Sequence, residues 1–150
     1  MVNVRRATIQ DAETLAQNNL SLAQESEHTI IAYDTALAGV RSLLRDSTKG
    51  FLLVAEEHGN IIGQMMITFE WSDWRNTSIW WLQSVYVHPE YRKKGVFTKM
   101  IEQITQEAQS QDVKKLRLYV HTDNTAAIDV YERLGMRQQP YIIYEIPAEP

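Results

Sequence analysis

The stretch from Ile79 to Val87 carries large apolar side chains at both alternating sets of positions. Successive side chains of a β-strand point to opposite faces of a sheet, so this pattern predicts a central strand that is covered on both faces. Simple alternation divides these side chains into two sets, with Trp80, Leu82, Ser84 and Tyr86 on one face and Trp81, Gln83, Val85 and Val87 on the other. Any fold for this chain must therefore cover this strand from both sides.

The rest of the chain alternates between strand-like and helix-like patterns. Strands are predicted at residues 2–8, 51–55, 61–69, 116–120 and 141–146, and helices after Thr8, after Asp34, over 97–108 and over 124–134. The turn His58-Gly59-Asn60 favours an antiparallel hairpin. The strand–helix–strand path from Ile79 to Val120 requires a parallel crossover connection. The prediction is a mixed α/β sheet in the order β-α-α-β-β-β-α-β-α-β.

Composition excludes several functional classes. The chain has 150 residues, which predicts one domain spanning 1–150. It has no cysteine, which excludes disulfides, thiolate metal sites and a cysteine nucleophile, and no His or carboxylate spacing indicates a metal site. No stretch reaches the about 20 apolar residues of a membrane helix and no signal peptide is visible, so we expect a soluble, cytoplasmic protein without a membrane partner. A net charge of −4 argues against nucleic-acid binding.

The segment from Ser84 to Met100 contains the pattern most closely tied to chemistry. The predicted central strand is followed by a basic turn and then an amphipathic helix, the turn containing Arg92, Lys93, Lys94 and Gly95. Free N–H groups at a helix N-terminus beside three cations suit a phosphate group. These residues alone leave two interpretations open, an anionic ligand site and a solvated basic turn that caps a core helix. A P-loop and a dinucleotide fingerprint are excluded because their glycine spacings are absent.

This segment resembles motif A of the GNAT superfamily of acyl-CoA-dependent N-acyltransferases. The family signature is Arg/Gln-x-x-Gly-x-Gly/Ala after a strand ending in Val-x-Pro, and it is matched by Arg92-Lys93-Lys94-Gly95-Val96-Phe97 after Val87-His88-Pro89. A second segment is similar to motif B of the family, with Asn124, Ala127, Tyr131, Gly135 and Met136 at the motif positions. The order of elements matches too. The resemblance therefore covers essentially the whole chain and implies a GNAT-like, mostly antiparallel mixed sheet with helices on both faces.

The resemblance implies direct acetyl transfer from acetyl-CoA, the acyl-donor cosubstrate, to the primary amine of a small-molecule or peptide acceptor. It implies that the motif A turn holds the pyrophosphate through Arg92, Lys93, Lys94, Gly95, Val96, Phe97 and Thr98. It implies that the pantetheine arm pairs with the end of the central strand and contacts motif B, through Val85, Tyr86, Val87, Asn124 and Ala127. Tyr131 is the implied general acid for the departing thiolate, although its helical spacing alone fits a core aromatic equally well.

One position departs from the family pattern. Phe97 stands where the family has a second Gly or Ala, whose small size lets the backbone approach the pyrophosphate. Its spacing with Ile101, Ile104 and Ala108 predicts that the ring points into the sheet, which leaves the site intact. A non-catalytic acyl-CoA-binding or sensing module is the alternative function, and Phe97 is the one residue that favours it.

The acceptor side is less defined by the sequence. Three residues are candidates for the group that takes the proton of the acceptor amine, namely Glu70, Asp73 and His121. The alternative interpretation is that each of them is a solvated loop charge. Trp71 and Trp74 lie near a predicted turn and suit either an acceptor pocket or a homodimer contact. Glu25 and Glu27, between the first two predicted helices, favour a cationic amine as acceptor.

Overall fold

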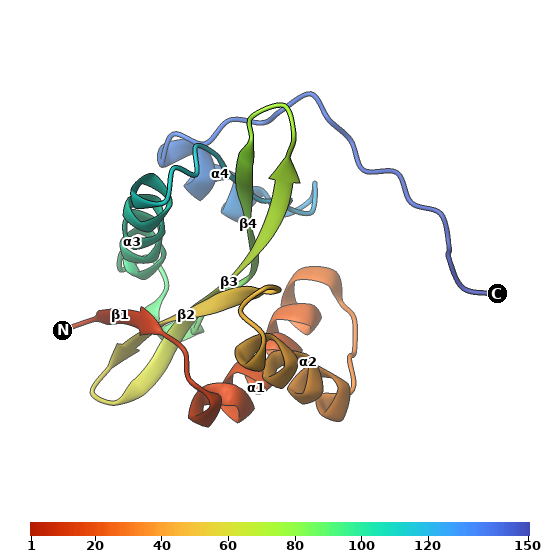
Figure 1. The fold of residues 1–150 in the computed structure, drawn as a ribbon. Coiled ribbons are helices and arrows are strands. Elements are labelled where there is room, and N and C mark those ends of the chain that lie inside the picture. The colour runs from red at the N-terminus through yellow and green to blue at the C-terminus, as the bar shows by residue number, and fades with distance from the viewer.

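A five-stranded open sheet runs through the protein, which a computed structural model describes over residues 1–150 (Figure 1). The strands lie side by side in chain order, as β1 (Asn3–Arg6), β2 (Gly50–Glu57), β3 (Asn60–Ser72), β4 (Thr77–Val87) and β5 (Leu116–Arg117). The first four strands pair antiparallel in succession, and β5 pairs with β4 in parallel. The predicted mixed, mostly antiparallel sheet is confirmed. β4, the strand predicted to be central, has β3 and β5 as its neighbours.

Helices cover both faces of this sheet. Helices α1 (Ala12–Glu27) and α2 (Tyr33–Arg45) lie together on one face, and α3 (Val96–Ser110) covers the other (Figure 1). Helix α4 (Thr125–Arg133) follows β5, and the short 3₁₀ helices η1 (Ile9–Asp11) and η2 (Pro89–Tyr91) precede α1 and α3. None of the helices combines the length and the hydrophobicity that a membrane crossing requires.

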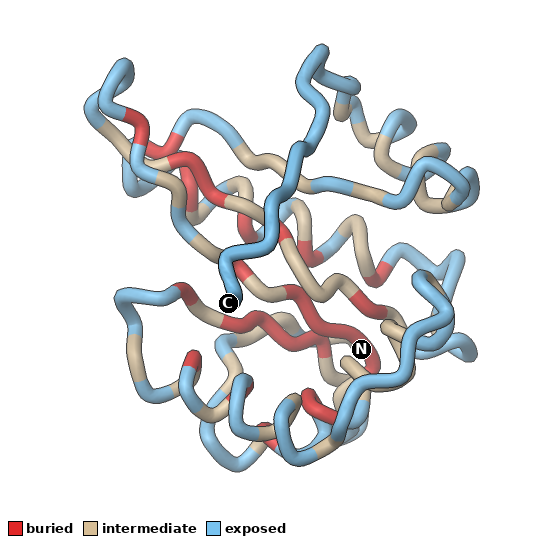
Figure 2. Tube along the Cα trace, turned by 90° about the vertical axis from the view of Figure 1, so that its right-hand side faces the viewer, coloured by how far each residue is buried: buried red, intermediate tan, exposed pale blue.

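The core forms one layer on each face of the sheet. Along β2, Leu52 and Val54 pack with α1 and α2, whereas Leu53 and Ala55 pack with α3. Buried residues concentrate in the central strands, while the C-terminal segment is exposed along its length (Figure 2). Burial on both faces explains why these strands are apolar at successive positions.

An ion pair fixes the N-terminal strand to the start of α1. The two terminal nitrogens of Arg5 donate to the Asp11 carboxylate at 2.8 and 3.1 Å, and the Thr8 N–H donates to it at 2.7 Å. Glu56 on β2 lies 3.2 Å from the same guanidinium. The hydrogen bonds from Arg5 lower the pKa of Asp11 below its ordinary value. The pair thus joins β1, β2 and η1.

Replacing Asp11 with Asn is expected to lower the free energy of unfolding by about 2 kcal/mol at neutral pH, because a charge-assisted pair is lost. The lowered pKa of Asp11 determines the pH range over which this stabilisation is lost. The stabilisation is present above the unfolded-state pKa of about 3.9 and is lost as the pH falls through the folded-state value. Urea unfolding of wild type and Asp11→Asn at both ends of this window measures the difference. Asp129→Asn, at an exposed position of α4, is the control. An undiminished difference in acid would contradict this role.

Two predicted strands are wrong in their extent. Residues 141–146 form no strand, and β5 covers only Leu116–Arg117 of the predicted 116–120. From residue 137 onward the backbone makes no hydrogen bond to another backbone group. A strand is stable only against a neighbouring strand, and these residues have none within their own chain. The last β in the predicted order is therefore absent.

Candidate active site at the open edge of β4

The end of β4 leaves one strand edge without a neighbour. On one side β3 pairs with β4 as far as Val87. On the other side β5 pairs only with Trp80 and Trp81. The stretch from Leu82 to Val87 therefore has no strand neighbour on this side, which suits an extended ligand that adds as a further strand. Three predicted cofactor-binding residues lie on it, namely Val85, Tyr86 and Val87.

A β-bulge reshapes this free edge. Ser84 has a φ angle of 47°, and the register between β3 and β4 shifts beside it. The extra residue reverses the alternation of side chains. The side chains that pack on the α3 side are consequently Trp80, Leu82, Val85 and Val87. The predicted division of faces fails beyond Gln83, because alternation assumes an unbroken strand.

Gln64 links the bulge to α1. Its fully buried side chain lies on β3 opposite Tyr86, which places both residues on the α1 face. Gln64 Nε2 donates to Asn19 Oδ1 at 2.7 Å and to the Ser84 carbonyl at 3.2 Å. Gln64 Oε1 is buried and accepts no hydrogen bond. Gln64 and Asn19 were not predicted from the sequence. The available signal was the one amide side chain, Gln64, inside the apolar run 61–67.

The turn after η2 presents a row of free backbone amides. Gly95 precedes α3 with a φ angle of 81°, and the first helical hydrogen bond runs from the Lys99 N–H to the Gly95 carbonyl at 3.0 Å. The N–H groups from Lys93 to Thr98 donate no hydrogen bond of good geometry within the chain. Lys93 and Lys94 belong to the same turn and form no ion pair. Together these groups suit an anion, because the helix N-terminus adds its own partial positive charge.

Arg92 is engaged within the protein. Its Nε donates to the Val87 carbonyl at 2.8 Å, and one terminal nitrogen donates to Glu25 at 2.8 Å. The guanidinium also lies 5.4 Å from the centre of the Tyr86 ring. Arg92 therefore ties the end of β4 to α1, and the charges of the turn that remain unpaired are those of Lys93 and Lys94.

Phe97 and Tyr131 face each other across α3 and α4, with ring centres 5.5 Å apart. Phe97 is only partly buried, because the α3 residues that enter the core are Val96, Met100, Ile104 and Ala108. Phe97 packs against the margin of this core layer, as predicted, but the most buried position of the first helical turn is Val96. Burial raises the pKa of the Tyr131 hydroxyl above its ordinary value. At neutral pH this hydroxyl is a proton donor without a partner in the protein.

The N-terminus of α4 is capped by Asn124. Its Oδ1 accepts a hydrogen bond from the Ala127 N–H at 3.2 Å, as expected for an N-cap residue. The Nδ2 group of Asn124 donates no hydrogen bond within the protein and is available to a ligand. The two motif B residues predicted to contact the cofactor therefore lie together in the first turn of α4.

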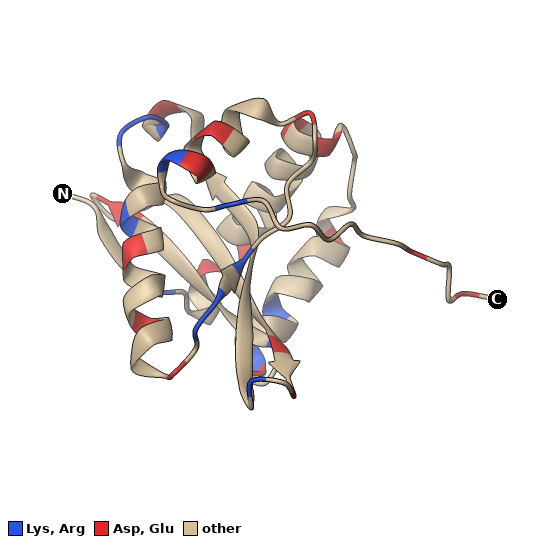
Figure 3. Ribbon diagram, turned by 90° about the horizontal axis from the view of Figure 1, so that it is seen from above, with Lys and Arg blue, Asp and Glu red and all other residues tan.

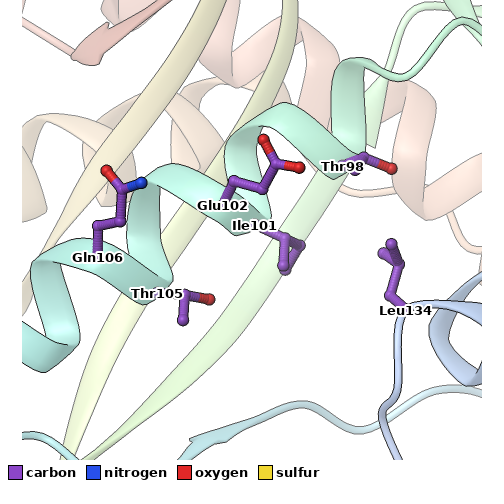
Figure 4. A pocket seen from close by; sticks show the side chains of 6 residues that line it. All are labelled: Thr98, Ile101, Glu102, Thr105, Gln106 and Leu134. Carbon is purple, nitrogen blue, oxygen red and sulfur yellow. The ribbon is translucent and has the colours of Figure 1, made fainter.

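A shallow pocket of about 370 Å³ lies along α3 and begins near its N-terminus. Figure 4 shows that Leu134, just after α4, lies across from the α3 side chains, and the lining residues are Thr98, Ile101, Glu102, Thr105, Gln106 and Leu134. The pocket begins at Thr98, the last of the free amides. The pocket and the amide row therefore meet at the N-terminus of α3.

Two of the three predicted proton acceptors, Glu70 and Asp73, lie away from this site, whereas His121 lies in the loop before α4 and accepts a hydrogen bond from the Asp123 N–H at 3.1 Å. Glu70 accepts a hydrogen bond from Trp81 Nε1 at 2.9 Å and lies 3.7 Å from Arg117. Asp73 lies at the far end of β4, roughly 25 Å from Val85 at about 3.3 Å per strand residue. The structure therefore separates Glu70 and Asp73 from the motif A turn. Acidic and basic residues are both spread over several helices, strands and loops and do not gather on one element (Figure 3).

A protein-family model described as the acetyltransferase (GNAT) family matches residues 10–136. A thialysine N-epsilon-acetyltransferase of Bos taurus is 35% identical over 75 residues, which are 50% of this chain and 44% of that protein. An acetyltransferase of Yersinia pestis is 33% identical over 91 residues, which are 61% of this chain and 60% of that protein. The chain thus covers less than two thirds of each of these curated relatives.

A solved structure is similar along the entire chain. The crystal structure of a possible acetyltransferase from Clostridium difficile 630 is 36% identical and has a TM-score of 0.93. The match covers 100% of this chain and 99% of that chain.

Proposed function

The chain belongs to the GNAT family of acetyltransferases, and we propose that it transfers the acetyl group of acetyl-CoA directly to a primary amine. The observation that supports this activity most strongly is that the unpaired edge of β4 and the row of free backbone amides follow one another along the chain. The unpaired edge of β4 ends beside the free amides of Lys93 to Thr98. Such a surface accommodates a ligand that consists of an extended arm joined to an anionic group.

Acetyl-CoA supplies an acyl group that is activated as a thioester. The amides of 93–98 and the charges of Lys93 and Lys94 hold its pyrophosphate. The edge from Val85 to Val87 holds its pantetheine arm, and the pocket between Thr98 and Leu134 takes in the part beyond the pyrophosphate. Arg92 contributes by fixing the end of β4 against Glu25.

Two groups of the chain act on the reacting atoms. A backbone N–H at 85–87 polarises the thioester carbonyl, an effect worth about 3–4 kcal/mol in comparable sites. The amine nitrogen bonds to the acetyl carbon as the C–S bond breaks, and the Tyr131 hydroxyl donates its proton to the departing thiolate. The proton that the amine loses passes to solvent water, from which Tyr131 regains its own. Its raised pKa keeps it protonated through neutral pH. The chain has no cysteine to carry the acetyl group, which favours direct transfer to the amine.

We expect the acceptor to be a small cationic amine. The residues outside 90–117 carry a net charge of −7, which favours a cation. The name of the Bos taurus relative supports an ε-amine as acceptor. A thiol-release assay with polyamines, aminoglycosides, amino-acid amides and peptide N-termini tests this class. Turnover confined to anionic acceptors would contradict it.

The second candidate function is a non-catalytic acyl-CoA-binding module. It is favoured by Phe97, whose ring stands where the family has a small residue. The two functions differ in one measurement. Acetyl-CoA that binds without acceptor-dependent release of CoA identifies the binding module.

The raised pKa of Tyr131 also makes a prediction about pH. An acid whose pKa is raised keeps its proton to higher pH, so Tyr131 is expected to remain a donor beyond the ordinary phenol value of about 10. The kcat of the wild type at saturating substrates should therefore show no alkaline loss below about pH 10 that depends on this residue. A pH profile of wild type and Tyr131→Phe measures it. A wild-type decline centred near neutral pH that disappears in Tyr131→Phe would rule out this assignment.

A further inference from the structure

Gln64 places a polar amide in the interior of the protein. Its side chain is fully buried between β3 and α1, and its Oε1 atom accepts no hydrogen bond. A buried polar atom without a partner destabilises the folded state. Methionine has nearly the same length and would fill this space without that cost, as Met65 and Met66 do at the next two positions. The amide is therefore explained by what its Nε2 group does.

The Nε2 group of Gln64 holds the carbonyl of Ser84. It donates to that carbonyl at 3.2 Å and to Asn19 Oδ1 at 2.7 Å. Asn19 follows the fully buried Leu15 and Ala16 by four and three residues, so all three lie on the face of α1 that packs on the sheet. The bond to Asn19 fixes the amide of Gln64, and the second bond reaches the bulge of β4.

The bulge has a strained backbone that needs such support. Ser84 has a φ angle of 47°, which is a left-handed conformation that serine adopts only rarely. Two residues of β4, Ser84 and Val85, stand opposite Met65 alone on β3. Strained conformations of this kind persist only where neighbouring groups hold them. The hydrogen bond from Gln64 is the side-chain contact that holds Ser84.

One peptide group connects this contact to the proposed reaction. The Ser84 carbonyl and the Val85 N–H belong to the same planar trans peptide, so they point in opposite directions. Because the carbonyl points towards Gln64, the Val85 N–H points away from it. This N–H is one of the three at 85–87 that we assign to polarisation of the thioester carbonyl.

We propose that Gln64 is a positioning residue, which holds the Ser84 carbonyl and thereby keeps the Val85 N–H directed at the thioester carbonyl of acetyl-CoA. The inference rests on the proposed function and assigns the polarising group to one residue. A directed N–H contributes most when negative charge develops on the carbonyl oxygen. Loss of Gln64 should therefore lower kcat far more than it lowers the affinity for acetyl-CoA.

Infrared difference spectroscopy tests the proposal without turnover, using acetyl-CoA with an isotope-labelled acetyl carbonyl. A hydrogen bond to the carbonyl oxygen lowers its stretching frequency, so binding to the wild type is expected to lower it. Gln64→Met keeps the side-chain volume and should reduce this shift, while calorimetry gives an affinity close to that of the wild type. Leu43→Val is the control, because it disturbs the core between α2 and the sheet without contacting Ser84. An equal shift in Gln64→Met and wild type, or no shift in the wild type, would overturn the proposal.

Kinetics then separates positioning from packing. Gln64→Met is expected to lower kcat about 10- to 100-fold, which is part of the effect of a complete oxyanion donor, with little change in KM for acetyl-CoA. Asn19→Ala removes the acceptor that fixes Gln64 and should cause a smaller loss of the same kind. A wild type that shifts the carbonyl frequency but acetylates no amine would contradict the proposed function, and the infrared comparison would still decide the role of Gln64.

Ser84→Gly supplies the rescue. Glycine adopts a positive φ angle without strain, so the bulge no longer depends on Gln64 in this variant. Adding Gln64→Met to Ser84→Gly should therefore reduce kcat and the infrared shift much less than it does in the wild type. Equal losses in the two backgrounds would show that Gln64 acts through packing, which would overturn the proposal.

Discussion

Replacing Tyr131 with Phe is expected to lower kcat about 100- to 1,000-fold, the usual contribution of a general acid. The substitution removes only the hydroxyl, so the ring contact with Phe97 is retained. Affinity for acetyl-CoA should therefore remain close to that of the wild type. Steady-state kinetics with the best acceptor, combined with calorimetric binding of acetyl-CoA, separates the two effects.

The matched control for this experiment is Tyr33→Phe. Tyr33 is a partly buried tyrosine that begins α2 and packs in the opposite core layer. This variant should keep the wild-type kcat. If Tyr131→Phe were as fast as Tyr33→Phe, Tyr131 would be a packing residue, and a different group would protonate the thiolate.

Replacing Gly95 with Asp is expected to weaken acetyl-CoA binding at least about 100-fold, or roughly 3 kcal/mol. A side chain at Gly95 enters open space at the start of α3, and its carboxylate would lie among amides that bind a pyrophosphate. Aspartate adopts a positive φ angle more readily than most residues, which limits the backbone strain. Calorimetric titration with acetyl-CoA measures the loss.

Gly59→Asp is a control with nearly the same local constraints. Gly59 has a φ angle of 78° against 81° for Gly95, and neither position has an atom within 4 Å of an added Cβ. Gly59 lies in the β2–β3 turn, so its substitution adds the same charge and similar strain away from the site. Equal affinities of the two variants for acetyl-CoA would place the pyrophosphate elsewhere.

Much of the fold could be predicted because the relevant signals are local. Apolar residues on both faces of 79–87 identify β4, His58-Gly59-Asn60 identifies the β2–β3 turn, and a lone glycine after three cations identifies the start of α3. Asn124 at the head of α4 is likewise visible, since capping depends on the next three residues. The contact that the structure shows between the two motifs is the one between the rings of Phe97 and Tyr131.

The parts that could not be predicted depend on contacts between distant residues. The bulge at Ser84 depends on the register of β3 and on Gln64, so alternation alone misplaces Val85 and Val87. Phe97 and Val96 are both apolar, and only the packing of α3 on the sheet decides which of them is buried. The segment 141–146 has a strand sequence without a strand neighbour in its own chain, and sequence pattern carries no information about a partner edge.

Analysis of both products of one reaction tests the central claim most directly. The intact protein is incubated with acetyl-CoA and each cationic amine of the panel, and free CoA and N-acetylated amine are quantified by mass spectrometry. Direct transfer predicts that CoA is released only when an amine is present, in equal amount to the acetylated amine. Binding of acetyl-CoA without amine-dependent CoA release from any acceptor would contradict it and would identify the chain as a binding module.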